Sequence, residues 1–202
     1  MSAEDNSVNI IDERGRYHHG DLRAALVAEG MRQLAGSDAD HLSLREIARK
    51  VGVSATAVYR HFPDKHALLT ALAHAGGAQL AQRQMAAQEA AGGGRAGFDA
   101  TGRAYVRFAL DNPALFRLMT ASAREPGVVD PATGEITGLG LLRRNVAALA
   151  APGTSEHTQR IRAIQSWAMV HGLAMLMLDG QVPHDDSLID CAVDTAPILD
   201  RE

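Results

Sequence analysis

The sequence predicts an all-α protein on three observations. Apolar residues recur at helical spacing along most of the chain, helix caps and glycine or proline stops separate these stretches, and no convincing alternating strand or internal repeat interrupts them. With 202 residues and 46% hydrophobic content, the chain is long enough for one or two small domains with a sizeable core. We therefore expect helices packed on helices throughout.

The first two helices are expected over residues 21–34 and from residue 44. Ser43 and Glu46 are three residues apart, which predicts a reciprocal capping box at the start of the second helix. Gly52 follows the last periodic residue and predicts a left-handed helix end. The apolar face of this second helix consists of Leu44, Ile47, Ala48 and Val51.

A short third helix follows. Ser54 is a second N-cap candidate, and Pro63 restricts the backbone of the preceding residue after about two turns. So short a helix is stable only when packed on its predecessor, with Val53, Val58 and Phe62 inward. Its small residues come first and its bulky polar ones later, an order that suits insertion into the major groove of DNA. The stretch 43–65 therefore predicts a helix-turn-helix.

An ordinary helical hairpin with a solvated polar face would show the same caps and glycine turn. The order of the residues goes further: from Gly20 to Leu72 the sequence resembles the N-terminal domain of the tetracycline-repressor (TetR) family, most closely in LSLREIARKVGVSATAVYRHFPDKHALL. The resemblance implies a three-helix DNA-binding domain in which Tyr59 and His61 belong to the YxHF motif and Lys65 opens the fourth helix. The DNA-binding residues expected from it are Ser43, Arg45, Ser54, Ala55, Thr56, Ala57, Tyr59, Arg60, His61 and Lys65.

Charge is distributed as this interpretation requires. The whole chain carries a formal charge of −4, whereas residues 14–66 hold nine Lys or Arg against six Asp or Glu, a local excess of +3. We expect Arg45, Arg49 and Arg60 to contribute mainly to this positive field. Arg14 and Arg16 precede the first helix and could form an arm that reaches the minor groove or the DNA backbone.

The rest of the chain is also expected to be helical. A long fourth helix opens at Pro63 or Asp64 and runs toward residue 91, and the GGGRAG sequence at 92–97 predicts its end and a linker. Further helices are expected at 98–110, 113–122, from about 136 to before Pro152, 155–178 and 185–199, with a loop at 124–138. The predicted domains are a flexible arm (1–16), the helix-turn-helix domain (17–66) and a helical effector-binding and dimerisation domain (67–202).

The last two expected helices are unusually apolar. Residues 155–178 leave almost no polar face, which predicts a helix buried on all sides. Because a small domain does not need so much apolar surface, we expect these helices to pack against their copies in a homodimer, as the TetR resemblance also implies. The dimer would place its two helix-turn-helix domains in successive major grooves of a palindromic operator, about 34 Å apart or a multiple of that distance.

The sequence WAMVHG at 167–172 resembles the WHG-type C-terminal domain of one TetR branch. Trp167 and His171 are four residues apart and share a helix face. Either these two residues are packing residues, with His171 bonded to a backbone carbonyl, or they belong to a pocket for a small, largely apolar effector. The expected pocket residues are Tyr105, Phe108, Phe116, Met119, Trp167, His171 and Met175.

Other chemistries find little support. The nine histidines show no H-x-x-x-H or H-E-x-x-H spacing and no C-x-x-C occurs, so we expect no metal and no cofactor. No G-x-S-x-G elbow, P-loop or G-x-G-x-x-G after a strand is present, so no catalytic residue is assigned. The single cysteine excludes an internal disulfide framework. With no signal peptide and no uncharged stretch of about 20 apolar residues, we expect a cytoplasmic protein without a membrane partner.

The leading hypothesis is a ligand-responsive transcriptional regulator, most simply a repressor. Its homodimer would bind double-stranded operator DNA and be released by the effector, and the resemblance implies a pendulum-like motion of the fourth helix. One alternative is a constitutive DNA-binding or interaction protein without effector. Another is a small helical enzyme that uses the C-terminal pocket, for which His171 is the evident titratable candidate.

Overall fold

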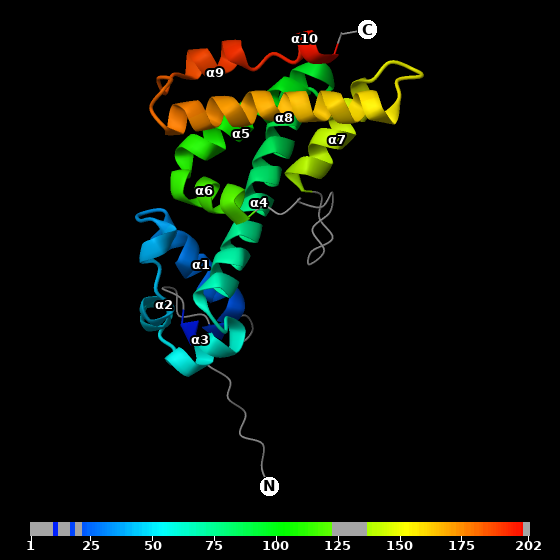
Figure 1. Cartoon of the computed structure of the whole chain (residues 1–202). Coiled ribbons are helices and arrows are strands. Elements are labelled where there is room, and N and C mark those ends of the chain that lie inside the picture. The colour runs from blue at the N-terminus through cyan, green and yellow to red at the C-terminus, as the bar shows by residue number, and fades with distance from the viewer. Residues whose placement is uncertain (1–9, 12–16, 19–21, 123–136, 200–202) are drawn as a thin grey trace. The chain divides into compact units, whose positions relative to one another are not determined.

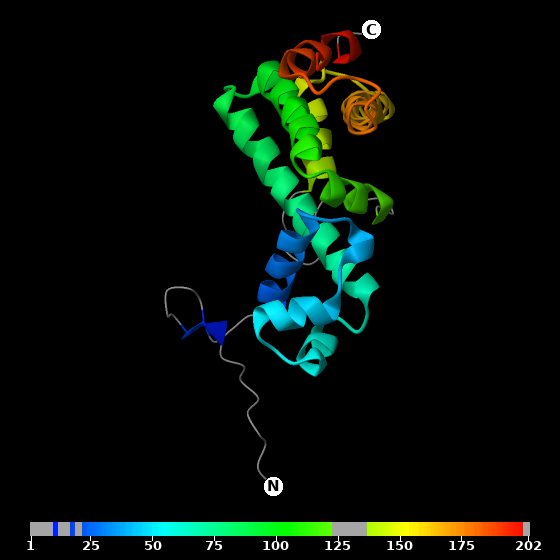
Figure 2. The same cartoon turned by 90° about the vertical axis from the view of Figure 1, so that its left-hand side faces the viewer.

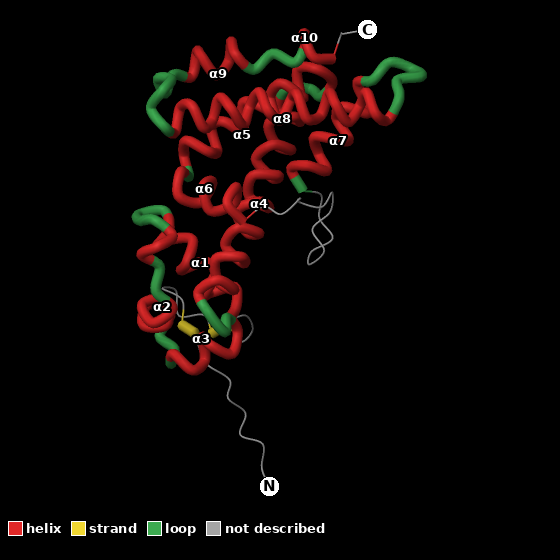
Figure 3. The backbone as a smooth tube through the Cα atoms, in the orientation of Figure 1, coloured by secondary structure: helices red, strands yellow, loops and turns green. Residues whose placement is uncertain are grey.

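The computed structural model describes residues 10–11, 17–18, 22–122 and 137–199 (Figure 1). Within these ranges the chain is almost entirely helical, which confirms the predicted all-α class (Figure 3). The chain forms two compact units, residues 1–75 and 76–202. The predicted division into an arm (1–16) and domains 17–66 and 67–202 stays a prediction, and Arg14 and Arg16 lie outside the described residues.

The first unit is built around three short helices and the start of a long one. Its elements are β1 (Ile10–Ile11), β2 (Tyr17–His18), α1 (Leu22–Leu34), the 3-10 helix η1 (Ala39–His41), α2 (Leu44–Val51), α3 (Ala55–His61) and the first turns of α4 (Lys65–Ala90). The two strands, which the sequence did not suggest, are antiparallel and pair Ile10 with His18 and Ile11 with Tyr17. With two residues each, they add no layer to the helical fold.

The core of the first unit joins all four of its helices. The core contains Leu26 and Leu34 of α1, Ile47 of α2 and further buried apolar residues from α2 to the start of α4. Those residues are Ala48, Val58, Phe62, Leu68 and Leu72. At Gly30 a Cβ atom would lie 3.0 Å from Leu72 Cδ2, so α1 and α4 approach closely there. The apolar stripes predicted for α1, α2 and α3 are therefore the surfaces that meet.

In its described residues, the second unit contains the remainder of α4 and six further helices. They are α5 (Gly94–Asp111), α6 (Pro113–Ser122), α7 (Gly138–Leu149), α8 (Glu156–Leu178), α9 (Asp186–Ala192) and α10 (Ala196–Leu199). The most extensive helix contact is between α5 and α8. Figure 2 views α8 nearly end-on, with α9 and α10 beside it. At Gly102 of α5 a Cβ atom would lie 2.8 Å from Val193 Cγ1 and 3.1 Å from Val170 Cγ1, so glycine permits this close packing.

One apolar cluster in the second unit joins four helices. Phe98 of α5, Val146 of α7 and Ala163 of α8 are buried together with Leu199 of α10. Because these residues lie about 100 positions apart at the extremes, the cluster fixes the end of the chain against the start of α5. The helix ends around it follow local chemistry: the hydroxyl of Ser155 accepts a hydrogen bond from the Thr158 N–H at 3.1 Å and caps α8.

Two predicted boundaries were wrong. Helix α5 begins at Gly94 rather than residue 98, because Gly92, Gly93 and Gly94 all have positive φ and reverse the chain within three residues. The expected single helix 185–199 is broken into α9 and α10. Pro197 has no N–H to continue a helix, and Thr195 hydrogen-bonds to Asp99 of α5 instead.

The expectation that α8 is buried on all sides was also wrong for the single chain. Ile161, Ile164, Trp167 and Leu176 are exposed along it, with Ile164 at 51%. Among the described residues α8 is the one helix long and apolar enough to cross a membrane by length and composition, a test that helices of soluble proteins also pass. At 3.6 residues per turn, Ile161, Ile164 and Leu176 lie on one side of the helix, whereas Trp167 lies about 180° around the helix from Leu176.

Candidate functional site

The helix-turn-helix forms as the sequence predicts. Helix α2 ends at Gly52, whose φ of 81° is the left-handed conformation expected there. The Ser54 hydroxyl accepts a hydrogen bond from the Ala57 N–H at 3.2 Å, so Ser54 caps α3. Val58 and Phe62 are buried, and Val53 is partly buried. Two short helices are thereby held at a fixed turn, with one face of α3 against α2.

The other face of α3 is open. Tyr59 is 44% exposed, and Arg60 and His61 beside it are exposed as well. At the N-terminal end, Ser54, Ala55 and Thr56 are exposed and Ala57 is partly buried. These residues form the candidate reading face, which therefore combines small side chains at the start of the helix with a phenol, a guanidinium and an imidazole near its end.

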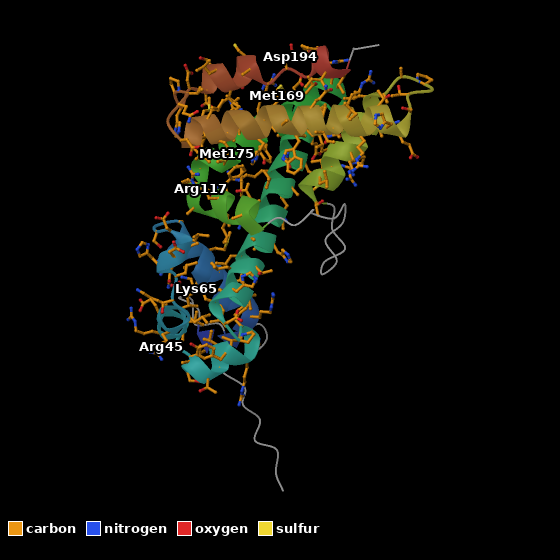
Figure 4. The ribbon with its side chains drawn as sticks, in the orientation of Figure 1. Arg45, Lys65, Arg117, Met169, Met175 and Asp194 are labelled. Carbon is orange, nitrogen blue, oxygen red and sulfur yellow. The ribbon has the colours of Figure 1, made fainter. Side chains whose placement is uncertain are left out.

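The predicted capping box at the start of α2 does not form. Ser43 occupies the N-cap position, but its side chain makes no cap hydrogen bond. The Glu46 carboxylate is instead bonded to Arg49 through two guanidinium nitrogens, at 2.5 and 3.0 Å. This hydrogen-bonded pair lowers the pKa of Glu46 and raises that of Arg49. Arg49 therefore has its charge paired, whereas exposed Arg45 makes no ion pair within the described part of the chain (Figure 4).

Lys65 lies at the first position of α4, where the sequence places it. Its Nζ donates a hydrogen bond to the backbone carbonyl of Asp40 at 2.5 Å, a contact across 25 residues that the sequence gives no sign of. Asp64 precedes it and caps α4 by accepting from the Ala67 N–H at 2.7 Å. Since a lysine ammonium has three donors, the bond to Asp40 holds Lys65 in place and leaves two donors for an anion.

Four of the seven predicted effector residues form an aromatic cluster between α5, α6 and α8. The Tyr105 hydroxyl lies 2.9 Å from His171 Nδ1, and Trp167 Nε1 donates to the Tyr105 oxygen at 3.4 Å. The Phe116 ring lies edge-on to Tyr105 at 5.4 Å and 5.8 Å from the imidazole of His171. Among the described residues, His171 thus bonds to a side chain and not to a backbone carbonyl.

Burial sets the protonation of this cluster. Tyr105 is 9% exposed, and burial raises the pKa of its hydroxyl, an effect that the bond from Trp167 opposes. Burial also lowers the pKa of His171, because the charged imidazolium loses solvation. Both side chains are therefore neutral at neutral pH.

The other three predicted effector residues have different surroundings. Phe108 is fully buried, and the guanidinium of Arg83 lies 5.2 Å from its ring centre. Met119 lies against α4, where a Cβ atom on Gly76 would come within 2.7 Å of its sulfur. Met175 is a partly buried residue of α8, labelled in Figure 4. A separate surface groove over α4 and α7, lined by Met85, Gln88 and Arg144 among others, contains none of the predicted effector residues.

Two polar contacts of the second unit had no signal in the sequence. Asp99 bonds to Thr195, 96 positions away, and Arg107 pairs with Asp186 at 2.8 Å and with Asp190 at 2.9 Å. Both tie α9 and α10 to α5. Within the described ranges no group of three or more His, Cys, Asp or Glu side chains could hold a metal ion.

Both units match families of known proteins. Residues 26–72 match the bacterial regulatory proteins of the tetR family, and residues 98–196 match the tetracyclin repressor-like C-terminal domain. An uncharacterized HTH-type transcriptional regulator of Haemophilus influenzae is 30% identical over 116 residues, 51% of this chain. The match spans only 57% of that relative's own length.

Solved structures extend the likeness to most of the chain. A protein of unknown function from Rhodococcus sp. RHA1 is 35% identical, with a TM-score of 0.69 over 89% of this chain and 95% of that one. A TetR variant from Acinetobacter baumannii AYE in complex with minocycline has a TM-score of 0.60 over 90% and 94% of the two chains; at 19% identity it shows the fold alone. With a TetR-type helix-turn-helix and a TetR-type C-terminal domain in one chain, this protein belongs to the TetR family of transcriptional regulators.

Proposed function

We propose that the chain is a ligand-responsive repressor that binds a palindromic operator as a homodimer and is released by a small, largely apolar effector. The observation that supports this most directly is the exposed reading face of α3, held on α2 by the Gly52 turn and the Ser54 cap. The TetR-type N-terminal match covers the same residues.

We expect different residues to contact the major groove and the phosphates of the DNA. Ala55, Thr56 and Ala57 enter the major groove, where small side chains allow close approach and make few base-specific hydrogen bonds. Tyr59, His61 and Lys65 bind phosphates, while Arg45 and Arg60 strengthen the local positive field. Ser43 and Ser54 lie near the same phosphates of the DNA backbone. With so few base-reading groups, DNA shape contributes to the choice of operator.

The second copy covers the apolar side of α8. Ile161, Ile164 and Leu176 on α8 and Leu188 on α9 are each about 40% exposed or more. Exposed apolar side chains at helical spacing are typical of a helix that packs on another helix. A twofold axis through this face relates the two helix-turn-helix domains, as a palindromic operator requires.

The effector binds beside the aromatic cluster of Tyr105, Phe116, Trp167 and His171. The TetR variant solved with minocycline is a fold relative that holds a small molecule, which favours a ligand in this unit. Release from DNA requires the ligand to bind the DNA-free conformation more tightly than the DNA-bound one. The ligand cannot change the free energy of operator binding by more than this difference in its own binding free energy. The motion of α4 implied by the TetR resemblance is the proposed link between effector binding and release from DNA.

The DNA assignment is tested with operator fragments selected from the source genome. We expect Tyr59→Ala and Lys65→Ala each to weaken binding by about tenfold or more, and Lys65→Ala to lower the slope of log affinity against log salt by about one. Arg32→Ala is the matched control, since it removes an exposed cation of the same unit that is already paired with Glu29. Unaltered operator binding by folded Tyr59 and Lys65 variants would contradict the assignment.

The dimer is tested on α8. Ile164→Glu places a charge at the most exposed apolar position and should give monomers in sedimentation equilibrium, together with loss of operator binding. His157→Glu adds the same charge to an exposed polar position of the same helix and should leave the dimer intact. A dimer that survives Ile164→Glu would place the interface elsewhere.

A constitutive regulator without effector is the second candidate. It is favoured by the complete burial of Phe108 and Phe116 and by the satisfied hydroxyl of Tyr105, which together leave the predicted pocket residues well packed. Operator titrations at fixed salt, with and without candidate ligands, distinguish the constitutive regulator from the ligand-responsive repressor. A ligand that binds saturably but leaves operator affinity unchanged would favour the constitutive regulator.

A further inference from the structure

The hydrogen bonds of the aromatic cluster have a defined direction. An indole N–H can only donate, so the oxygen of Tyr105 is the acceptor of the bond from Trp167. The hydroxyl of Tyr105 still has its own hydrogen to donate. Among the described residues its remaining partner is His171 Nδ1, at 2.9 Å.

This direction determines the tautomer of His171. Because Nδ1 accepts the Tyr105 hydrogen, the single ring proton of the neutral imidazole is on Nε2. The opposite tautomer would leave the hydroxyl hydrogen of Tyr105 without an acceptor in a side chain that is 9% exposed, and an unmade bond at a buried donor is costly. The lowered pKa of His171, caused by burial, keeps the ring neutral and the arrangement intact at neutral pH.

The Nε2–H of His171 is then a donor without a partner among the described residues. The Nε2 atom is not the ring nitrogen that bonds Tyr105, and the ring centres of Phe116 and Trp167 lie 5.8 and 6.2 Å from that of the imidazole. Trp167 is 40% exposed and His171 is partly exposed, so a small molecule can approach from the Trp167 edge of α8, on the far side of the helix from Leu176 of the proposed dimer face.

We infer that this site selects a ligand that has an apolar body and a hydrogen-bond-accepting oxygen, either a carbonyl or a carboxylate, directed at His171 Nε2. The inference rests on the proposed effector site and names the chemistry of its ligand. The aromatic rings contact the apolar body, and the oxygen accepts a hydrogen bond from His171 Nε2–H, the donor of this cluster that has no partner among the described residues. A primary ammonium group in the same place would bring donor against donor and is rejected.

Three probes with the same phenyl body test this selectivity: 4-phenylbutan-2-one, 3-phenylpropanoate and 3-phenylpropylamine. Trp167 is the only tryptophan of the chain, so its fluorescence reports binding at this site without a label. With DNA-free protein at neutral pH, we expect the ketone or the carboxylate to bind at least about tenfold more tightly than the amine. Comparing the dissociation constants of the ketone and the carboxylate shows which of the two oxygen groups the site prefers.

Two variants assign the selectivity to His171. His171→Phe keeps an aromatic ring but removes the donor, and should make the oxygen and ammonium probes bind alike. Tyr105→Phe keeps the imidazole but frees its tautomer, and should reduce the preference without abolishing it. His157→Phe, the same substitution at an exposed position of α8, should leave the preference unchanged.

Three results would overturn the inference: an amine that binds as tightly as the ketone and the carboxylate, a preference that survives in folded His171→Phe protein, or no response of Trp167 to any probe at millimolar concentration. If His171→Phe does not fold, the Tyr105→Phe protein decides, because an unchanged preference there also contradicts the tautomer assignment. Operator titrations keep the two proposals separate. Oxygen-selective binding without operator release overturns ligand control alone, and operator release without oxygen selectivity overturns this inference alone.

Discussion

Asp99 of α5 accepts two hydrogen bonds from Thr195, from the hydroxyl at 2.6 Å and from the backbone N–H at 3.1 Å. Both residues are buried, and one carboxylate oxygen takes both bonds. The contact interrupts the helix between α9 and α10, since Thr195 turns to Asp99 where a continuous helix would need its N–H for Cys191. It also fixes the terminal helices against α5.

Thr195→Val should therefore destabilise the second unit. The substitution removes the hydroxyl bond to a buried carboxylate while nearly conserving volume, which costs about 1.5–3 kcal/mol for a charged acceptor. Urea unfolding measures the loss as a lower midpoint. Thr195→Ser retains the hydroxyl and should stay close to the parent protein; a Thr195→Val protein of unchanged stability would show that the bond contributes little.

Gly76 and Gly77 of α4 should respond oppositely to alanine. A Cβ atom at Gly76 would lie 2.7 Å from Met119 Sδ and 2.8 Å from Leu115 Cδ1, whereas at Gly77 nothing lies within 4 Å. Gly77→Ala should raise the free energy of unfolding by about 1 kcal/mol through helix propensity alone. Gly76→Ala makes the same backbone change but forces the Met119 and Leu115 side chains of α6 to move, and overpacking costs roughly 1–3 kcal/mol. Equal stabilities for the two variants, measured by urea unfolding, would contradict the close approach of α6.

Ser54 allows the helix cap to be separated from the DNA contact. Ser54→Ala removes the bond from the Ala57 N–H and should lower the stability of the first unit by about 1 kcal/mol. Ser54→Asp retains a capping oxygen but adds a negative charge to the reading face, so it should keep the stability and weaken operator binding. Thermal unfolding and DNA titration of both proteins check this. Equal operator affinity of the Asp variant and the parent would place Ser54 away from the phosphates.

His171 should make stability depend on pH in a defined direction. Burial lowers its pKa in the folded protein below the value of about 6.5 expected for the unfolded chain. The unfolded chain therefore binds a proton first as pH falls, and the stability that neutral His171 provides above this value is lost as pH falls through the folded pKa. His171→Asn, which retains a polar partner for Tyr105, should lose less stability between about pH 7.5 and 5. Parallel stability curves for the two proteins in urea unfolding would contradict the buried imidazole.

Much of the helical order could be predicted because helix ends are local. The Gly52 turn and the Ser54 cap each involve atoms within four residues, so the sequence predicts them directly. The capping box at Ser43 was wrong for a reason that is also local: Glu46 had two partners within three residues and pairs with Arg49. A pattern that offers two competing bonds does not say which one forms.

The sequence by itself determined the all-α class, the helix-turn-helix and the family, since periodic apolar residues and helix caps act over one or two turns. Tertiary structure alone decided which side of α8 stays exposed, that Lys65 is held by Asp40, and that His171 bonds to Tyr105 rather than to a backbone carbonyl. The physical reason is distance along the chain. The last two contacts join residues 25 and 66 positions apart, and the burial of α8 depends on which distant helices pack against it, so only the folded packing can select them.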